Sequence, residues 1–253
     1  MLAPERQQQI LTLLEERGTV KTIDLAEEFQ VTDETIRRDL QILAENGQLS
    51  RVHGGASNLN GRPKLQSFSE RRSINVEKKR AIARAAIEFI QPGRTYAFDS
   101  STTVFELVCS LPDLPYRVLT NAYAVIDQLI AHEQTELIST GGRYHPKTQT
   151  FIGGDSYHFL RRHNINCAFV SSVGLDPEQG AAEGFEEQAV FKETLVQMAE
   201  EVILLIDSSK LMQRSEYFFA EIEQLTRIIT DKAADPMVIR RLISKGCSVT
   251  VAE

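Results

Sequence analysis

The feature of this sequence that most constrains its fold is an alternation of short β-rich runs with amphipathic helical patterns between residues 96 and 251. Strands that alternate with helices favour a mostly parallel sheet covered by helices on both faces. The expected strands cover residues 96–98, 118–119, 137–138, 168–170, 202–206, 228–229 and 249–251. The expected helices between them cover residues 104–111, 122–132, 188–200 and 236–245. This pattern predicts an α/β domain over residues 76–253.

The first 57 residues have a different pattern, which predicts a separate small domain. Three short amphipathic helices are expected, and Thr22 and Thr32 are the residues that we expect to cap the second and third of them. The alternating run at residues 49–53 leads into the flexible pair Gly54-Gly55. A short strand followed by such a turn is typical of the wing of a winged helix.

The third of these helices has the side-chain pattern of a DNA-recognition helix. Ile36 and Leu40 lie on its apolar side, while Arg37 and Arg38 project away from it. In a helix-turn-helix one helix braces across the DNA backbone and the next enters the major groove, where arginine binds guanine or phosphate. A solvated helix face is the alternative interpretation of the two arginines. The predicted DNA-binding residues are Thr32, Thr35, Arg37, Arg38, Arg51 and His53.

The distribution of charge allows DNA binding but does not show it. The chain has a formal net charge of −7, which is unusual for a protein whose partner is a polyanion. Residues 57–80 are nevertheless basic, with seven Lys and Arg against two Asp and Glu. Residues 58–75 lack a consistent period and contain Asn, Gly, Pro and Ser, so they are expected to form a linker. The predicted organisation is therefore a DNA-binding domain at 1–57, a linker at 58–75 and an effector-sensing domain at 76–253.

A run of hydroxyl side chains directly after an expected strand predicts an anion site. Residues 99–103 read Asp-Ser-Ser-Thr-Thr and open a helix, so hydroxyls and unpaired backbone N–H groups meet at the carboxyl end of a strand. Lys210 follows another strand and offers a positive charge. Simple helix capping, and a surface position for Lys210, are the alternatives. The predicted effector-binding residues are Asp99, Ser100, Ser101, Thr102, Thr103, Asn121, Gly141, Gly142 and Lys210.

The chain resembles the DeoR family of transcriptional regulators over nearly its whole length. Residues 31–40 read VTDETIRRDL and are followed by Gly47, Leu49, Arg51 and the run HGGA at 53–56. The blocks at 99–103, 120–121, 141–142, 153 and 207–210 resemble the sensor domain of that family, which is similar to ribose-phosphate isomerases, glucosamine-phosphate deaminases and coenzyme A transferases. The resemblance implies a repressor of a sugar or related metabolite operon, controlled by a phosphorylated small molecule.

The main alternative function is a sugar-phosphate isomerase or deaminase fused to a DNA-binding domain. Such an enzyme needs a general base. Glu186, Glu187 and Asp207 are available, but the sequence places none of them with a clear partner, so we predict that the chain is not an enzyme.

Cofactors and metals are not predicted. His158 and His163 lack the HExxH spacing of a zinc site, and the glycine pairs form neither a GxGxxG motif nor a P-loop. Three widely spaced cysteines argue against disulfides, and no signal peptide or membrane span is visible, so the expected location is the cytoplasm. The expected partners are double-stranded operator DNA, a phosphorylated sugar or related metabolite, and further copies of the chain.

Overall fold

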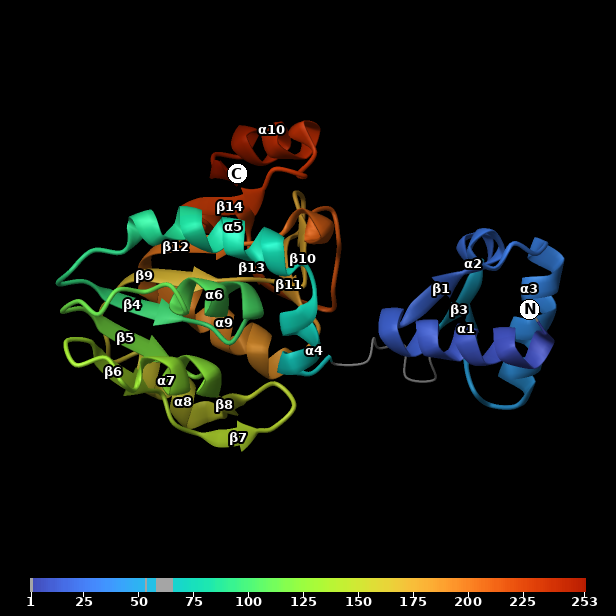
Figure 1. Cartoon of the computed structure of the whole chain (residues 1–253), viewed down its shortest axis with the longest axis horizontal. Coiled ribbons are helices and arrows are strands. Elements are labelled where there is room, and N and C mark those ends of the chain that lie inside the picture. Colours follow the sequence, from blue (N-terminus) through green and yellow to red (C-terminus); the bar gives the residue numbers. More distant parts are fainter. Residues whose placement is uncertain (1, 53, 58–65) are drawn as a thin grey trace. The chain divides into compact units, whose positions relative to one another are not determined.

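A computed structural model of the chain describes residues 2–52, 54–57 and 66–253, with the side chains of residues 15 and 16 excepted. It consists of two compact units, Met1–Gln66 and Ser67–Glu253 (Figure 1). Residues 58–65 of the predicted linker lie outside the described residues, as does His53.

The smaller unit has the expected three helices followed by a β-wing. In the described residues its strands form a three-stranded antiparallel sheet in the order β1-β3-β2. Its elements are α1 (Ala3–Arg17), β1 (Thr19–Lys21), α2 (Thr22–Phe29), α3 (Asp33–Glu45), β2 (Ser50–Val52) and β3 (Gly55–Ser57). The prediction of a winged helix-turn-helix is confirmed.

Of the two helix caps predicted in the smaller unit, one is confirmed and the other is wrong. Thr32 caps α3 as predicted, because its Oγ1 accepts a hydrogen bond from the Thr35 backbone N–H at 3.3 Å. The prediction that Thr22 caps α2 is wrong, since α2 begins at Thr22 and Lys21 holds the cap position. Strand β1 pairs with β3 as far as Lys21, and this pairing keeps the backbone extended up to that residue.

The larger unit is built on a parallel sheet, as predicted. Within the described residues this sheet has seven strands in the order β15-β14-β12-β9-β4-β5-β6, and all its neighbouring pairs are parallel. The strands are β4 (Thr95–Phe98), β5 (Arg117–Thr120), β6 (Glu136–Ser139), β9 (Ile165–Val170), β12 (Ala199–Leu205), β14 (Arg227–Asp231) and β15 (Ser248–Ala252). Each expected strand falls within or beside one of these elements.

Helices cover both faces of this sheet, which confirms the predicted α/β class (Figure 1). The helices are α5 (Val76–Ala86), α6 (Thr102–Val108), α7 (Tyr123–Leu129), α8 (Gly154–Leu160), α9 (Glu186–Met198) and α10 (Pro236–Ser244). Side chains of one strand alternate between two cores. Tyr96 and Phe98 pack with α5 and α6, whereas Ala97 packs with α8 and α9.

Two antiparallel additions escaped the sequence analysis because their strands are too short to show alternation. One is the pair β7 (Arg143–His145) and β8 (Thr150–Ile152). The other is a sheet of β10 (Gly174–Asp176), β11 (Gly180–Glu183) and β13 (Tyr217–Ala220). Gly180 is required there, because its φ is +94° and a Cβ would lie 2.0 Å from the Ala220 carbonyl oxygen.

The last part of the predicted linker forms a helix of the larger unit. Helix α4 (Phe68–Ser73) begins with a capping box in which Ser67 Oγ accepts from the Glu70 N–H at 3.2 Å and the Glu70 side chain accepts from the Ser67 N–H. Phe68 is buried edge-to-face against Phe105, with ring centroids 5.5 Å apart. A single buried aromatic in a polar run gives no periodic signal, which is why the sequence pattern favoured a linker.

Candidate functional site

The predicted DNA-binding residues lie on the recognition helix and the wing of the smaller unit. Arg37 and Arg38 are exposed on α3, on the side away from the buried Ile36 and Leu40. Arg51 is exposed in β2. Thr32 and Thr35 were also predicted to contact DNA. Their hydroxyls lie 2.9 Å apart at the start of α3. His53 lies outside the described residues.

A buried ion pair fixes α3 against α1, and sequence reasoning missed it. Asp39 is buried on the inner side of α3, and its Oδ2 lies 2.6 Å from Arg6 Nε. Its Oδ1 accepts a second hydrogen bond from Gln7 Nε2 at 2.9 Å. Separating the charges of a buried ion pair costs free energy. The contact of Asp39 with Arg6 therefore holds in place the helix that carries Arg37 and Arg38.

In the larger unit Asp99 organises the loop at the end of β4. Its carboxylate is buried and accepts hydrogen bonds from the backbone N–H of Ser101 at 2.8 Å and of Ser171 at 2.9 Å. It also lies 3.0 Å from Lys192 Nζ, which pairs with Glu183 as well. Although burial favours the neutral amine, Asp99 and Glu183 together raise the pKa of Lys192. Asp99 therefore holds the loop after β4 in place and ties it to Lys192.

The hydroxyls after Asp99 already have partners within the protein, with one exception. Ser101 Oγ caps the seven-residue helix α6 by accepting from the Val104 N–H at 3.3 Å. Ser100 Oγ accepts from Gln188 Nε2 at 3.3 Å, and Thr102 Oγ1 reaches the Arg71 carbonyl at 3.5 Å. Thr103 Oγ1 is buried and has no hydrogen-bond partner among the described residues. Three of the four hydroxyls of this loop are therefore hydrogen-bonded within the protein, which leaves fewer of them for a ligand than the sequence suggested.

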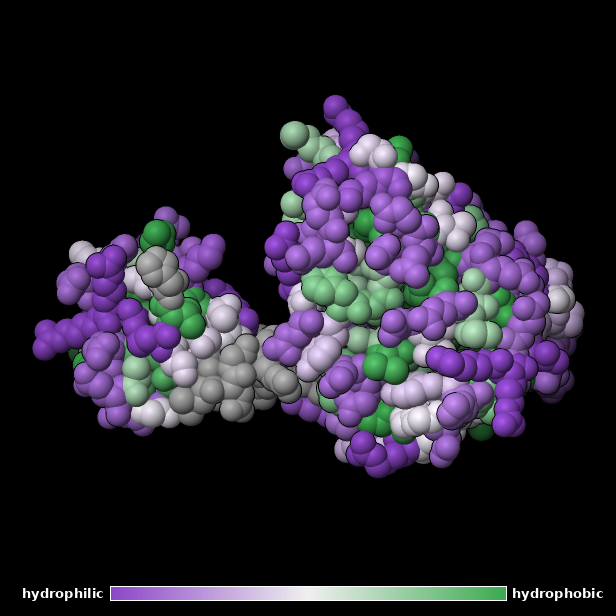
Figure 2. Space-filling view, turned by 180° about the vertical axis from the view of Figure 1, so that it is seen from behind, coloured by the Kyte–Doolittle hydropathy of each residue, from purple (hydrophilic) through white to green (hydrophobic). Residues whose placement is uncertain are grey.

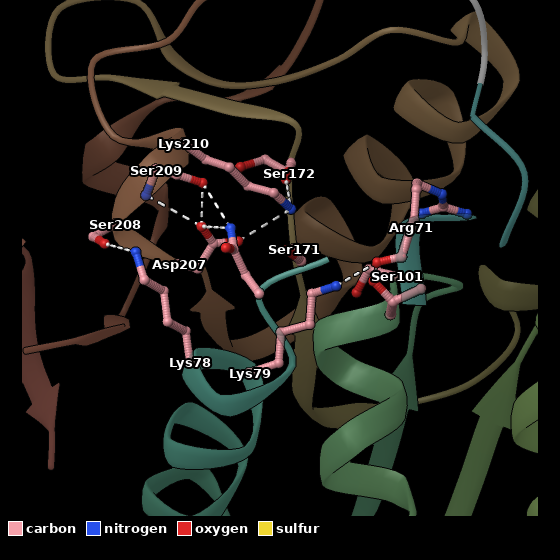
Figure 3. A network of polar contacts seen from close by, with 12 residues as sticks. Arg71, Lys78, Lys79, Ser101, Ser171, Ser172, Asp207, Ser208, Ser209 and Lys210 are labelled. Atoms are coloured by element: carbon pink, nitrogen blue, oxygen red, sulfur yellow. Dashed lines mark hydrogen bonds and ion pairs between the residues drawn. The ribbon is translucent and has the colours of Figure 1, made fainter. Parts of the chain in front are cut away.

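Lys210 belongs to a cluster of cations beside this loop. Lys210 Nζ donates to the Ser172 carbonyl at 3.0 Å and lies 3.9 Å from Asp207 Oδ2. Burial is the main cause that lowers the pKa of Lys210. Lys79 of α5 and Arg71 of α4 lie in the same network, in which Lys79 Nζ donates to the Arg71 carbonyl (Figure 3). Sequence reasoning noted these last two residues only as part of a basic segment.

The remaining predicted effector residues lie where strands β5 and β6 end. Asn121 Nδ2 donates to the Phe151 carbonyl at 3.1 Å, while its Oδ1 is buried without a partner among the described residues. The Gly141 carbonyl accepts from Ser156 Oγ. Gly142 has a φ of +116°, and a Cβ there would lie 2.8 Å from the Ile152 carbonyl oxygen. These residues hold β8 and α8 against the sheet edge, and their contact with an effector stays a prediction.

Of the carboxylates weighed as catalytic bases, Asp207 alone is held by a hydrogen-bond network among the described residues, and its Oδ2 is buried there without a hydrogen-bond partner. Asp207 Oδ1 accepts from Asn75 Nδ2 and from the Ser209 N–H, both at 3.1 Å. The backbone carbonyl of Glu187 accepts from the Tyr157 hydroxyl at 3.3 Å, a contact that does not involve its carboxylate, and Glu186 is exposed at the start of α9. The buried Glu183 is neutralised by Lys192.

In the described part of the chain no cluster of His, Cys, Asp and Glu has the arrangement of a metal site, and no helix is both long and apolar enough to cross a bilayer. The three cysteines are free thiols, and burial raises the pKa of Cys167 to about 12. A surface cavity of about 300 Å³, lined by Phe68, Arg72, Tyr123 and other residues of α4, α6 and α7, lies beside Arg72 rather than at Lys210.

These features define a winged-helix DNA-binding unit joined to a parallel α/β unit of the kind that binds ligands at its strand ends. The family models that match the chain describe the same two domains. Residues 6–61 match the DeoR-like helix-turn-helix domain, and residues 74–232 match the DeoR C-terminal sensor domain. The chain belongs to the DeoR family of transcriptional regulators.

Relatives match the chain over most of its length. An uncharacterized HTH-type transcriptional regulator, YulB of Bacillus subtilis, is 35% identical over 99% of this chain and 97% of its own. The L-fucose operon activator of Haemophilus influenzae is 33% identical over 90% of this chain and 92% of its own. Among solved structures, ribose 5-phosphate isomerase A from Methanocaldococcus jannaschii aligns with 54% of this chain and 55% of its own, at 14% identity and a TM-score of 0.41.

Proposed function

We propose that this regulator represses a sugar operon by occupying its operator, and that a phosphorylated sugar or related metabolite controls that occupancy. The observation that carries the proposal is the combination, in one chain, of two exposed arginines on a recognition helix with a cationic cluster at the strand ends of the α/β unit. The name of the L-fucose relative points to a sugar operon. We place the protein in the cytoplasm, where a regulator can reach its operator DNA.

The DNA-binding part of the proposal assigns base or phosphate contacts to Arg37 and Arg38. Replacing either by alanine is expected to weaken operator binding by about 1 to 3 kcal/mol if that arginine binds a base, and to reduce the salt dependence if it binds phosphate. Operator titrations at several salt concentrations measure both quantities. An Arg37→Ala, Arg38→Ala double variant that folds and keeps the parent affinity and salt dependence would contradict the assignment.

The effector part assigns the anion site to residues 99–103 and Lys210. Thr102→Ala and Lys210→Ala are expected to weaken the response to the effector while sparing operator binding by the ligand-free protein. Operator titration with and without a panel of sugar phosphates, for the parent and both variants, provides the measurement. If an effector is found and both variants respond to it at unchanged concentrations, the site lies elsewhere.

Repression is the simpler direction of control. A protein on an operator blocks polymerase by occupancy alone, whereas activation also needs a surface that contacts polymerase. Because the H. influenzae relative is named an activator, a reporter experiment is needed to decide whether this regulator represses or activates. A reporter behind the operator should rise when the regulator gene is deleted, and a fall would show activation.

We also propose that the chain does not catalyse a sugar-phosphate reaction. Glu183 and Lys192 neutralise each other in a buried pair, Asp207 Oδ1 is held by Asn75 and Ser209, and Glu186 is exposed at the start of α9. A general base needs a free carboxylate within reach of substrate. Incubation with pentose and amino-hexose phosphates should leave them unchanged, and turnover that is lost in a Glu187→Gln or Asp207→Asn variant would support the enzyme instead.

A further inference from the structure

The surface cavity beside Arg72 lies apart from the strand ends of the larger unit. It has a volume of about 300 Å³ and is bounded by α4, α6, α7 and the turn between β7 and β8. This volume is at the lower end of the range of small-molecule sites. Among the described residues, its lining includes neither the loop at 99–103 nor Lys210. The cavity is therefore distinct from the proposed effector site.

Aromatic rings form part of the wall of this cavity. Phe68 of α4 and Phe105 of α6 are buried, and their rings pack edge-to-face with centroids 5.5 Å apart. The side chain of Tyr123 of α7 is exposed instead, and its ring contacts that of Tyr144 at a centroid distance of 5.9 Å. Aromatic rings offer a large apolar contact area and a surface for stacking. The cavity therefore favours a ligand that carries an apolar group, above all an aromatic one.

Arg72 supplies a positive charge whose hydrogen-bond donors are free. Its guanidinium carbon lies 4.8 Å from the centre of the Phe105 ring. This cation–π contact uses the face of the guanidinium group and holds it in place, whereas the N–H donors lie in the plane of the group. Among the described residues the side chain has neither a hydrogen bond nor an ion pair. An arginine held in this way matches a carboxylate, which accepts two parallel hydrogen bonds from it.

Asp127 of α7 supplies a negative charge at the same cavity. Within the described part of the chain its carboxylate has no hydrogen-bond or ion-pair partner, and it does not pair with Arg72. A purely anionic ligand such as phosphate would be attracted by Arg72 but repelled by Asp127. A ligand that carries a cation beside its anion satisfies both side chains at once.

We propose that this cavity is a second ligand site, which binds a zwitterionic α-amino acid with an apolar side chain. The carboxylate of the ligand pairs with Arg72, its ammonium group pairs with Asp127, and its side chain packs on the aromatic wall. Single exposed ion pairs contribute little, so the affinity depends on both pairs together with the apolar contact. The inference goes beyond the proposed control by a phosphorylated effector and does not depend on it. Because α4 is the first element after the boundary at Gln66, the ligand restrains the helix that follows the segment leading to the DNA-binding unit.

The test uses L-phenylalanine as the probe, the full-length protein and isothermal titration calorimetry. The parent should bind the probe saturably, with a dissociation constant below about 10 mM. Two analogues separate the charges, since 3-phenylpropionate lacks the ammonium group and 2-phenylethylamine lacks the carboxylate. Each should bind at least about tenfold more weakly than L-phenylalanine, which corresponds to about 1.4 kcal/mol. No saturable binding of L-phenylalanine, or equal binding of all three compounds, would overturn the inference.

Two variants assign each charge of the ligand to its partner. Arg72→Gln should weaken the binding of L-phenylalanine and 3-phenylpropionate but leave that of 2-phenylethylamine unchanged, and Asp127→Asn should do the reverse for the two analogues. Arg84→Gln on α5 and Asp155→Asn on α8 are the matched controls, because both residues are exposed and lie outside the cavity lining. A structural defect weakens all three compounds alike. Equal weakening of all three, or parent-like binding in both variants, therefore contradicts the assignment.

A steric variant tests the site without changing any charge. Ala124 lines the cavity on α7, so Ala124→Phe should fill it and abolish the binding of L-phenylalanine. Ala131→Phe is the control, since Ala131 is exposed and lies outside the lining. Parent-like binding in Ala124→Phe would overturn the inference. So would a change in subunit number in that variant by sedimentation without amino-acid binding in the parent, which would show an interface between copies of the chain. None of these measurements uses operator DNA or a sugar phosphate, so their outcome is independent of the proposed function.

Discussion

At the residue scale, Lys79 combines a buried position in α5 with a pKa that lies close to physiological pH. Burial, reinforced by repulsion from Lys210 and Arg71, lowers the pKa of Lys79 from 10.5 to about 8, while Asp207 and Glu106 oppose the shift. The side chain is 3% exposed. An anion that binds beside it favours the charged form, so anion binding and protonation of Lys79 must strengthen each other.

The affinity for a phosphate monoester is therefore expected to fall as the pH rises through about 8. The monoester itself stays almost fully dianionic above pH 7, because its second pKa is about 6. The loss should approach tenfold per pH unit once Lys79 deprotonates. Binding titrations at pH 7 and pH 9 provide the measurement. Lys79→Met should bind more weakly at pH 7 and show a smaller change with pH, and an unchanged pH dependence in that variant would contradict the role of Lys79.

At the scale of elements, the recognition helix depends on a contact that spans two helices. Asp39 of α3 and Arg6 of α1 are 33 positions apart in the chain and form a buried pair at 2.6 Å. Arg17 and Glu28 form a second pair between α1 and α2 at 3.1 Å, but both side chains are at least 40% exposed. Solvent screens the exposed pair, so the two pairs should differ strongly in their effect on stability.

Asp39→Asn is expected to lower the free energy of unfolding of the smaller unit by about 3 to 5 kcal/mol, because it removes the negative charge from a buried ion pair. Glu28→Gln is the matched control and should cost at most about 1 kcal/mol. Denaturant unfolding followed by far-ultraviolet circular dichroism measures both, and operator affinity should fall with the loss of folded protein. Equal stability of the two variants would show that the buried pair does not hold α3.

At the scale of the whole molecule, one winged helix offers little area for specific DNA binding. Two half-sites one helical turn apart are the usual solution, and they need a protein with more than one copy of the chain. On the face shown in Figure 2, apolar surface is interrupted by polar side chains. Strongly exposed apolar side chains of the larger unit include Ile130, Met237 and Ile243.

We therefore predict that the protein is a homo-oligomer and that its α/β unit supplies the interface. Sedimentation at the concentrations that saturate the operator measures the mass directly. Arg37→Ala, Arg38→Ala should weaken DNA binding without changing that mass, since both arginines lie on α3. A strictly monomeric protein that still occupies its operator would contradict the prediction.

If an effector controls operator binding, the effector and the operator must change each other's affinity for the protein equally. If a sugar phosphate weakens operator binding, operator DNA must weaken sugar-phosphate binding by the same factor, typically about 5- to 150-fold. Effector titrations with and without saturating operator measure this factor. Unequal factors in the two directions would show that another equilibrium, such as a change in oligomeric state, accompanies binding.

The sequence by itself determined the strands of the parallel sheet, the α/β class and the exposed face of α3. Each depends on a period that repeats within one element, such as the apolar positions Ile36 and Leu40 opposite Arg37. The hydroxyl run at 99–103 was also visible, because it is continuous in the chain. The tertiary structure alone decided which charges meet. Arg71, Lys79 and Lys210 come from α4, α5 and the turn after β12, and no local pattern relates residues that far apart. The same holds for Lys192, whose partners Asp99 and Glu183 lie beside it only because the sheet brings the strand ends together. The energy of a buried charge depends on its neighbours in space rather than on those in the sequence.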